Sequence, residues 1–258
     1  MTSENNPDTA KPRRRPPWLM PLLCLVAGVA GATGAIWLSP RPDGSAGERA
    51  VMQKAVEEAI LANPQIIPDA ITRLQEMEVE KLLASNREAI ETPFAGAWAG
   101  AGDGDVVLVE FFDYNCPFCR RSAADVARLL EEDPKLKVVF RDFPVLGPDS
   151  ERFARASLSA AQQGQKQFLQ FYRSVFEAQG PLDQKRLIQS VRQADMNESK
   201  VAASLESREL GAEIDRNLSM GRALGLTGTP SYIVGNKILS GAVGYDALKQ
   251  AIAGARAQ

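Results

Sequence analysis

The 258-residue chain contains no histidine, which removes imidazole chemistry from consideration. Cys–His and Ser–His nucleophile pairs, histidine general bases and histidine-ligated zinc sites are all excluded. Only three cysteines are present, Cys24, Cys116 and Cys119, and they are too few and too unevenly placed for a disulfide scaffold. The net charge of -2 gives no indication of a nucleic-acid partner. Apolar content of 45% and charged content of 24% are ordinary for a globular protein.

The first forty residues have the pattern of a membrane or targeting segment. A basic tail, residues 1–17, precedes an uncharged run of 21 residues, 18–38. At about 1.5 Å per residue, a helix of that length crosses a hydrocarbon core of roughly 30 Å. The basic flank belongs on the cytoplasmic side, so we expect a signal-anchor with the rest of the chain outside the cytoplasm. The alternative is a signal peptide cleaved near Ala30-Gly31-Ala32.

Residues 39–50 form a polar linker, and residues 51–92 follow as an amphipathic helical segment. Asn63 followed by Pro64 predicts a break between two helices, with the proline at the start of the second. Because an amphipathic helix must bury its apolar stripe, we expect this segment to self-associate; folding back onto the main domain is the alternative. The stripe has near-helical spacing and consists of Val56, Ile60, Ile67, Ile71, Leu74 and Met77.

Residues 93–258 alternate strand and helix patterns and predict an α/β domain. The expected order is β-α-β, a helical block and then β-β-α, which is typical of an α/β domain with a helical insertion. The expected elements are a buried strand at 106–112, a helix at 117–132, a strand at 136–140, helices over about 148–224 with breaks at Gly180-Pro181 and near Asn197, a hairpin at 231–241 around Gly235-Asn236, and a helix at 245–255.

Cys116 and Cys119 lie where the apolar strand gives way to a helix. The unpaired N–H groups and the positive dipole end of a helix N-terminus stabilise a thiolate, which is the attacking species in disulfide exchange. A second cysteine one turn later can reach back and resolve the mixed disulfide. The spacing therefore predicts that Cys116 attacks and Cys119 resolves. The reversible disulfide between them would be the redox centre, with no separate cofactor.

Two other uses of this cysteine pair are possible. A structural disulfide across two intervening residues would close a very small loop and restrain the unfolded chain little. A common zinc site lacks ligands, because the soluble part of the chain has no further cysteine and no histidine. Two thiolates could instead hold Cu(I). A Cu(I)-binding envelope protein is therefore the alternative to a redox enzyme.

Two further features belong with the cysteine pair. Glu110 lies inside the apolar strand, where a buried carboxyl would have a raised pKa and could exchange a proton during catalysis. The alternative is an acid at the strand edge that faces water. Thr229-Pro230 precedes the hairpin, which is a natural position for a cis peptide bond.

These features resemble a DsbA-type thioredoxin-fold protein of the bacterial envelope. The matching marks are V-L-V-E-F-F-D-Y-N-C-P-F-C at 107–119, the helical insertion, and G-T-P at 228–230. The resemblance implies that Cys116 is the exposed nucleophile, Cys119 its buried partner and Glu110 the buried acid. It further implies that Thr229 and Pro230 form a cis-proline loop that binds substrate backbone beside the cysteines. Pro117 and Phe118, between the cysteines, are assigned to the same substrate-binding surface.

The resemblance also implies partners and a location. Substrates would be unfolded or mispaired secreted proteins, oxidised or reduced together with a membrane redox partner, at the inner membrane facing the periplasm or free in the periplasm after signal cleavage. Residues 51–90 resemble the N-terminal oligomerisation region of ScsC-like proteins, which implies a homo-oligomer. Phe118 departs from the Pro-His dipeptide of strongly oxidising DsbA enzymes, and Thr229 is more like isomerase-type members. Both differences favour isomerisation or reduction over oxidation.

Overall fold

The computed structural model describes residues 46–257. Its internal contacts divide the chain after Pro68 into two units, and each is described by itself below. The expected anchor at residues 18–38 and residues 39–45 of the expected linker lie outside the described residues; the rest of that linker, residues 46–50, is helical, so the predicted start of the helical segment at residue 51 is wrong by five residues. Within residues 46–257, no helix is long and apolar enough to cross a membrane.

Two helices precede the sheet, α2 (Ala46–Ala62) and α3 (Ile66–Glu91). They are separated at Asn63-Pro64, as the sequence predicts, but Pro64 lies in the turn and not at the first helical position, because the second helix begins at Ile66. The Ile66 amide donates a hydrogen bond to the Asn63 carbonyl at 3.2 Å. Most of the predicted apolar stripe is at least half exposed in the single chain. These exposed residues are Val56, Ile67, Ile71, Leu74 and Met77.

The second unit is built around a five-stranded sheet in the order β1-β3-β2-β4-β5. Strands β2 and β3 are parallel, and the other neighbouring pairs are antiparallel. Central strand β2 places Glu110 opposite Phe140 of β3 and Tyr232 of β4. The strands are β1 (Trp98–Gly100), β2 (Val106–Phe112), β3 (Leu136–Asp142), β4 (Ser231–Val234) and β5 (Lys237–Ser240).

Alternate residues of β2 face two different groups of helices. Leu108 and Phe112 join a core that includes α4 (Pro117–Glu132), α10 (Tyr245–Arg256) and part of the helical insertion. Val109 and Phe111 point the other way, into a second core that includes α3. Glu110 has the parity of Leu108 and Phe112, so its side chain lies on the α4 side of the sheet.

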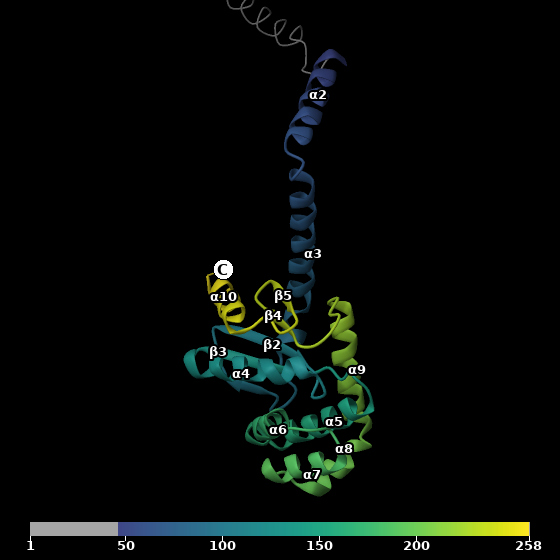
Figure 1. The fold of residues 1–258 in the computed structure, drawn as a ribbon, viewed down its shortest axis with the longest axis vertical. Coiled ribbons are helices and arrows are strands. Elements are labelled where there is room, and N and C mark those ends of the chain that lie inside the picture. The colour runs from purple at the N-terminus through teal and green to yellow at the C-terminus, as the bar shows by residue number, and fades with distance from the viewer. Residues whose placement is uncertain (1–45, 258) are drawn as a thin grey trace, which may run out of the picture. The chain divides into compact units, whose positions relative to one another are not determined.

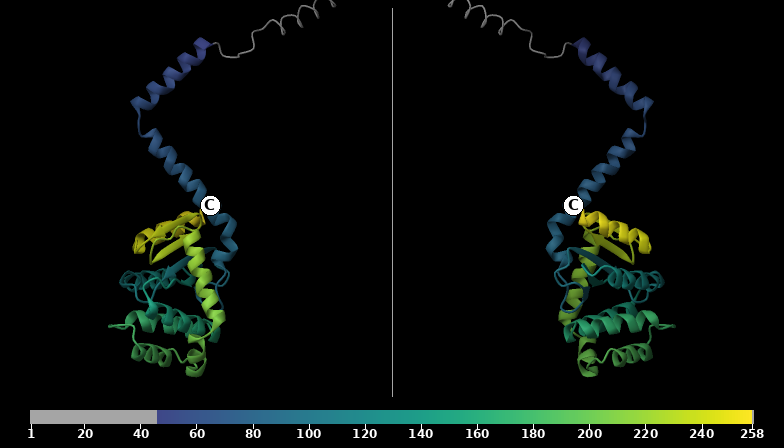
Figure 2. Two further views of the ribbon diagram at one scale, coloured as in Figure 1. Left: turned by 90° about the vertical axis from the view of Figure 1, so that its right-hand side faces the viewer. Right: turned by 90° about the vertical axis from the view of Figure 1, so that its left-hand side faces the viewer.

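The helical insertion consists of five helices, and Figure 1 shows α5 to α8 gathered beyond the sheet. Its core is a cluster of aromatic rings that join it to β2 and β3; the Phe140 and Tyr172 ring centroids, for example, are 4.8 Å apart. The helices are α5 (Pro148–Gln163), α6 (Gln165–Glu177), α7 (Gln184–Gln193), α8 (Glu198–Leu205) and α9 (Arg208–Ala223). Figure 2 shows the same layering of the second unit from two sides.

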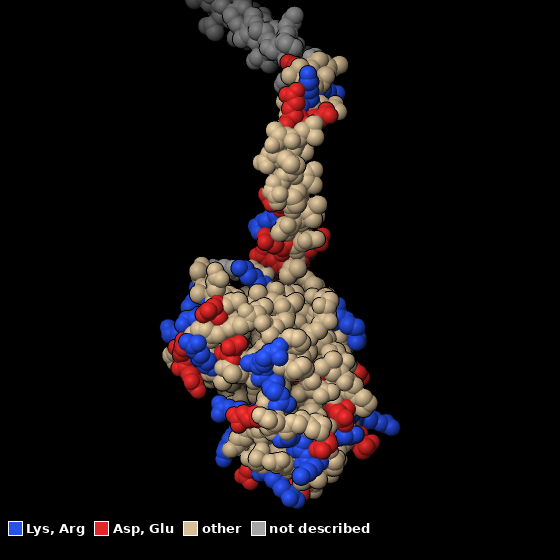
Figure 3. Space-filling model, viewed as in Figure 1, with Lys and Arg blue, Asp and Glu red and all other residues tan. Residues whose placement is uncertain are grey.

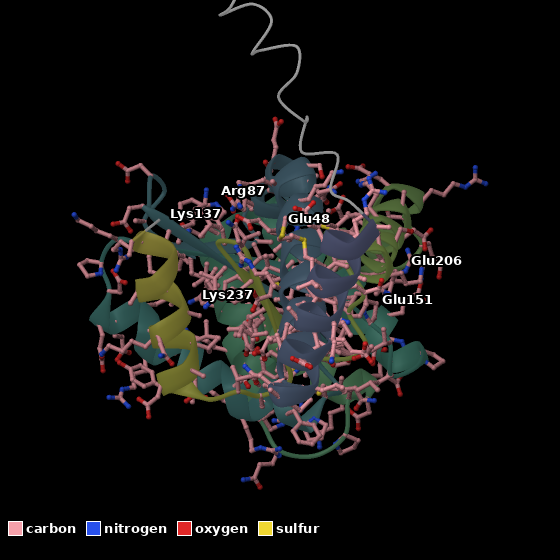
Figure 4. All side chains as sticks on the ribbon, turned by 90° about the horizontal axis from the view of Figure 1, so that it is seen from above. Glu48, Arg87, Lys137, Glu151, Glu206 and Lys237 are labelled. Atoms are coloured by element: carbon pink, nitrogen blue, oxygen red, sulfur yellow. The ribbon has the colours of Figure 1, made fainter. Side chains whose placement is uncertain are left out.

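The last turns of α3 belong to the core of the second unit, so this core extends back beyond residue 93. Leu83 and Ile90 are each 1% exposed and pack with Val109 and Phe111 of β2. Arg87, labelled in Figure 4, donates hydrogen bonds to the Gly235 carbonyl at 3.3 Å and to the Asn236 side chain at 2.7 Å. These contacts fix the end of α3 against the β4–β5 hairpin.

The structure adds two breaks and one strand to the expected pattern. The helical block is also interrupted at Gly164, whose φ of +141° is one that L side chains rarely adopt, and at Ser207, which caps α9. Strand β1 was not expected, because three residues are too few to show a period of two. The expected breaks near Gly180 and Asn197 are confirmed.

The surface charges of the second unit are mixed. Figure 3 shows Lys and Arg interspersed with Asp and Glu over the visible face, with uncharged surface between them. This face therefore offers no extended field of one sign that would steer a charged partner.

Candidate functional site

The two cysteines occupy the first turn of α4, as their spacing predicts. Cys116 is the N-cap residue, with an extended backbone (φ -84°, ψ 117°), and Pro117 follows at the first helical position. Cys119 is 0% exposed and belongs to the apolar core beneath the helix. Both thiols are free, so the structure describes the dithiol form of the pair.

The loop that leads into α4 is held by Asp113, a buried residue that the sequence analysis did not single out. One carboxylate oxygen of Asp113 accepts a hydrogen bond from the Asn115 amide at 2.8 Å. The other oxygen accepts from the amides of Val145 and Leu146 at 2.8 and 3.0 Å. The Cys116 amide donates to the Asp113 carbonyl at 3.0 Å. Asp113 therefore ties the cysteine loop to the loop that follows β3.

The structure brings Thr229 and Pro230 to the cysteine pair. Their peptide bond is cis, as predicted, and the Cys116 sulfur lies 3.2 Å from the Thr229 carbonyl oxygen, to which the thiol can donate. The expectation that Cys116 is exposed is wrong, because only 4% of the residue is accessible. The reason is this contact: the sulfur points across to the Thr229 carbonyl instead of outward to solvent.

Glu110 lies inside the protein beneath the cysteines and is 0% exposed, so the alternative of an edge acid facing water is wrong. Burial raises the pKa of Glu110 from 4.5 to about 7, against two hydrogen bonds that lower it. Tyr172 donates one of them at 3.0 Å, and Tyr232 donates the other at 3.3 Å. A carboxyl with a pKa near 7 is suited to accept or return a proton at neutral pH.

Cys119 is held in its thiol form by its surroundings. Burial is the largest cause that raises the pKa of this thiol, and the negative charges of Glu110 and Cys116 raise it further. Cys119 therefore needs a nearby base before it can attack a sulfur. Glu110 is close enough to influence the Cys119 thiol and has the pKa that this role requires.

An apolar surface surrounds the entrance to the pair. Phe118 is 52% exposed, and the Arg121 guanidinium lies 4.4 Å from the centre of its ring. Pro117 is also exposed. Val145 and Leu146, which Asp113 holds through their amides, are 45% and 46% exposed. Sequence reasoning missed this second loop, because two apolar residues after a strand look like any other connection.

No group of three or more histidine, cysteine, aspartate or glutamate side chains in residues 46–257 is placed to hold a metal ion. The two thiols of Cys116 and Cys119 are nevertheless soft donors of the kind that Cu(I) prefers. The copper alternative therefore stays a prediction, with this pair as its only candidate ligands among the described residues.

Comparison with known proteins agrees with this geometry. Residues 107–253, more than half of the chain, match the DSBA-like thioredoxin domain family. The chain belongs to this family. Residues 48–79 of the DSBA-like protein match a second family, the copper resistance protein ScsC N-terminal domain.

Several individual proteins that are similar to this chain are described as disulfide-forming proteins or thioredoxin-like oxidoreductases. The probable disulfide bond formation protein D of Bacillus anthracis is 27% identical over 164 residues, which cover 59% of this chain and 75% of that protein. A thioredoxin-like oxidoreductase from Silicibacter pomeroyi is 34% identical with a TM-score of 0.63, over 67% of this chain and 99% of that one. The catalytic domain of Proteus mirabilis ScsC is 29% identical with a TM-score of 0.64, over 69% and 99%. The DSBA-like protein is accordingly a protein thiol–disulfide oxidoreductase.

Proposed function

We propose that this DSBA-like protein exchanges disulfides in unfolded or mispaired envelope proteins through Cys116 and Cys119. The observation that carries the proposal is the arrangement at the α4 N-terminus. The Cys116 sulfur lies 3.2 Å from the carbonyl oxygen before cis-Pro230, while Cys119 and Glu110 are buried behind it. A nucleophile is thus placed next to backbone that can pair with an extended substrate, and its resolving partners are kept from water.

The chemistry can be written as two exchanges. The Cys116 thiolate attacks one sulfur of a substrate disulfide, the substrate S–S bond breaks, and the second substrate sulfur leaves as a thiolate that takes a proton from solvent. The Glu110 carboxylate then accepts the proton of Cys119, and the Cys119 thiolate attacks the Cys116 sulfur. This releases the reduced substrate and forms the Cys116–Cys119 disulfide. Oxidation of a substrate dithiol is the same sequence reversed, with Glu110 returning the proton to Cys119.

The apolar surface around Cys116 suits substrates that have not yet folded. Pro117 and Phe118, which follow Cys116 in the chain, and Val145 and Leu146, on the loop that Asp113 ties to the cysteine loop, are all exposed. Unfolded chains expose apolar side chains that such a surface can bind without a defined sequence. We therefore propose that these four residues, with Thr229 and Pro230, contact the substrate.

Trapping of mixed disulfides tests the roles of the two cysteines. In a Cys24→Ser background, which leaves only the pair, Cys119→Ser should accumulate mixed disulfides with substrate because resolution is blocked. Cys116→Ser should trap little, because the attacking sulfur is gone. The measurement is the amount of alkylation-quenched, reducible adduct on non-reducing gels. Full exchange activity in both variants would falsify the proposal.

The preferred direction of exchange can be measured as a reduction potential. Phe118 stands where strongly oxidising relatives carry histidine, so the pair should be less oxidising, and we propose isomerisation or reduction as its main activity. Equilibration in glutathione buffers should give about -180 mV or lower. A value near -120 mV would instead identify an oxidase that donates disulfides.

Cu(I) binding by the same pair is the second candidate function. It is favoured by the match of residues 48–79 to the N-terminal domain of copper resistance protein ScsC and by the two free thiols. Titration of the reduced protein with Cu(I) against a chromophoric chelator measures the affinity. Tight binding that is lost in Cys116→Ser supports this candidate, whereas binding no tighter than that of the Cys116→Ser variant removes it.

We further propose that residues 18–38 tether the protein to the inner membrane with the domain in the periplasm, where it would meet a membrane redox partner. The uncharged run and its basic flank support this location. Carbonate extraction of bacterial membranes should leave the full-length chain in the pellet. A shorter chain in the soluble periplasmic fraction would show cleavage of a signal peptide instead.

A further inference from the structure

Two buried tyrosines hold the carboxyl group of Glu110 from opposite directions. Tyr172, from α6 of the insertion, donates to Oε2 at 3.0 Å, and Tyr232, from β4, donates to Oε1 at 3.3 Å. Tyr172 is 5% exposed and Tyr232 is 0% exposed. Burial has the largest effect on the pKa of Glu110 and raises it, whereas these two hydrogen bonds lower it.

We infer that Tyr172 and Tyr232 are positioning residues that orient Glu110 toward its proton exchange with Cys119 and stabilise its carboxylate. The inference rests on the proposed role of Glu110. Each hydroxyl gives the carboxylate a hydrogen bond that a buried acid would otherwise lack. A buried carboxylate without them would keep its proton and could not act as a base for Cys119.

Tyr232 connects the acid to the cysteine side of the site. It lies two residues after Pro230, on the strand that begins where the cis-proline loop ends. Burial is the main cause that raises the pKa of the Tyr232 hydroxyl, and the charges of Glu110 and Cys119 raise it further. The Tyr232 hydroxyl is therefore near enough to Glu110 and Cys119 for their charges to affect its pKa.

Tyr172 connects the acid to a groove on the other side. The groove lies between α4 and α6, and Tyr172 forms part of its wall together with Arg120, Val126, Leu130, Arg173 and Glu177. Tyr172 thus belongs both to the wall of this groove and, through its hydroxyl, to the buried hydrogen-bond network of Glu110.

Neither tyrosine serves as the base. Burial and the charge of Glu110 raise the pKa of both hydroxyls above the ordinary tyrosine value, so both remain protonated donors. Glu110 accepts hydrogen bonds from the two tyrosines, and its charge also raises the pKa of Cys119 on α4 and of Tyr114 in the cysteine loop. The proton that leaves Cys119 consequently resides on Glu110.

The test compares single hydroxyl deletions with a matched control. Tyr172→Phe and Tyr232→Phe each remove one hydrogen bond to Glu110. Tyr114→Phe removes a hydroxyl from the same aromatic cluster, but that hydroxyl bonds Ser157 at 3.0 Å instead of Glu110. The readout is the pH dependence of the rate at which Cys119 resolves a glutathione adduct on Cys116. Difference infrared spectroscopy of the carboxyl stretch through a pH titration follows Glu110 directly.

The pH at which the resolution rate changes slope, called the break below, reports the pKa of Glu110. We expect Tyr172→Phe and Tyr232→Phe each to move this break upward by about one unit, because a donated hydrogen bond favours the carboxylate. At pH 7 that change lowers resolution about fivefold. Tyr114→Phe should leave the break in place. If Glu110→Gln abolishes the break but both tyrosine variants leave it unmoved, the inference is wrong. A break that survives Glu110→Gln overturns the proposed role of Glu110 itself.

Discussion

At the scale of single residues, the burial of Glu110 has two opposing effects: it favours catalysis and it lowers stability. Its position beneath the cysteines gives it a pKa of about 7, which is useful for proton exchange. The same burial makes its ionised form costly to the folded protein. Residues that serve chemistry in this way are expected to lower stability under the conditions in which they are ionised.

Replacing Glu110 by Gln should change how stability depends on pH. Between pH 4.5 and about 7 the folded chain keeps this proton while the unfolded chain has lost it, so raising the pH favours unfolding. Over that window the wild-type free energy of unfolding should fall by about 3 kcal/mol because of Glu110. Glu110→Gln should lack this fall. Urea unfolding at pH 4.5 and pH 8 measures it.

Asp142 serves as an internal reference in that experiment. Burial raises the pKa of Asp142 too, so Asp142 also makes the free energy of unfolding fall as the pH rises. This contribution is the same in the wild type and in Glu110→Gln. The difference between wild type and Glu110→Gln therefore isolates one carboxyl. Equal pH dependence in the two proteins would mean that Glu110 titrates normally.

The residues that sequence analysis identified are those whose role can be seen locally. The spacing of Cys116 and Cys119 identifies them as a candidate redox pair, and the position of Glu110 within an apolar strand identifies it as a candidate buried acid. Tyr172 and Tyr232 could not be found in this way, because they are 62 and 122 positions from the acid they bind. Nothing in the periodicity of α6 or β4 distinguishes a tyrosine that fills the core from one that donates to Glu110.

At the scale of elements, Arg141 fixes the end of α3 to the domain. Its guanidinium donates to the carbonyls of Ala89 at 2.5 Å and Thr92 at 2.6 Å, where α3 leaves its last carbonyls unpaired. It also lies 3.6 Å from Glu213 of α9, and both side chains are 6% exposed. One arginine on β3 thus joins the helix that precedes the sheet to the last helix of the insertion.

Arg141→Met should destabilise the domain strongly. It leaves the helix-end carbonyls without their donor and removes the buried positive charge beside Glu213, which keeps only its pair with Arg216; this should cost about 3 kcal/mol in the free energy of unfolding. Hydrogen exchange at amides of residues 83–92 should become faster. The control is Arg152→Met, whose exposed pair with Asp149 should contribute less than about 1 kcal/mol. Similar losses in the two variants would contradict the role given to Arg141.

Element boundaries followed from sequence where a strong local signal existed. Pro117 set the start of α4, and Gly235, with a φ of +55°, set the turn of the hairpin. Strand β1 and the fixed end of α3 gave no such signal, because both depend on partners elsewhere in the chain. Arg141 looked like a polar residue at the end of a strand, and only the folded arrangement shows what it binds.

At the scale of the whole molecule, the apolar stripe before the domain needs an explanation. Ile71, Leu74 and Met77 are each more than half exposed in a single chain. The amphipathic spacing of this segment, which lies in the residues 48–79 that match the ScsC N-terminal domain family, predicts that copies of this chain pack together there. Complete burial of such a side chain is worth about 1.5–3 kcal/mol, so burying the stripe between copies would contribute to association.

Leu74→Glu should lower the mass of the particle in solution. A charge in the stripe opposes its burial between copies, so light scattering of the variant should give a smaller species than the wild type. Thr72→Glu is the matched control, since it adds the same charge to an exposed residue two positions away, outside the stripe. Equal masses for Leu74→Glu and Thr72→Glu, or a monomeric wild type, would rule out self-association through this stripe.

The contact between Cys116 and the Thr229 carbonyl has a practical consequence for detection. Proteome-wide surveys rank cysteines by how fast small alkylating probes label them in the native state. Only 4% of Cys116 and none of Cys119 is accessible to such probes. We therefore expect small alkylating probes to label Cys116 slowly in the native dithiol protein, so a survey of this kind would place a working redox pair among the unreactive cysteines.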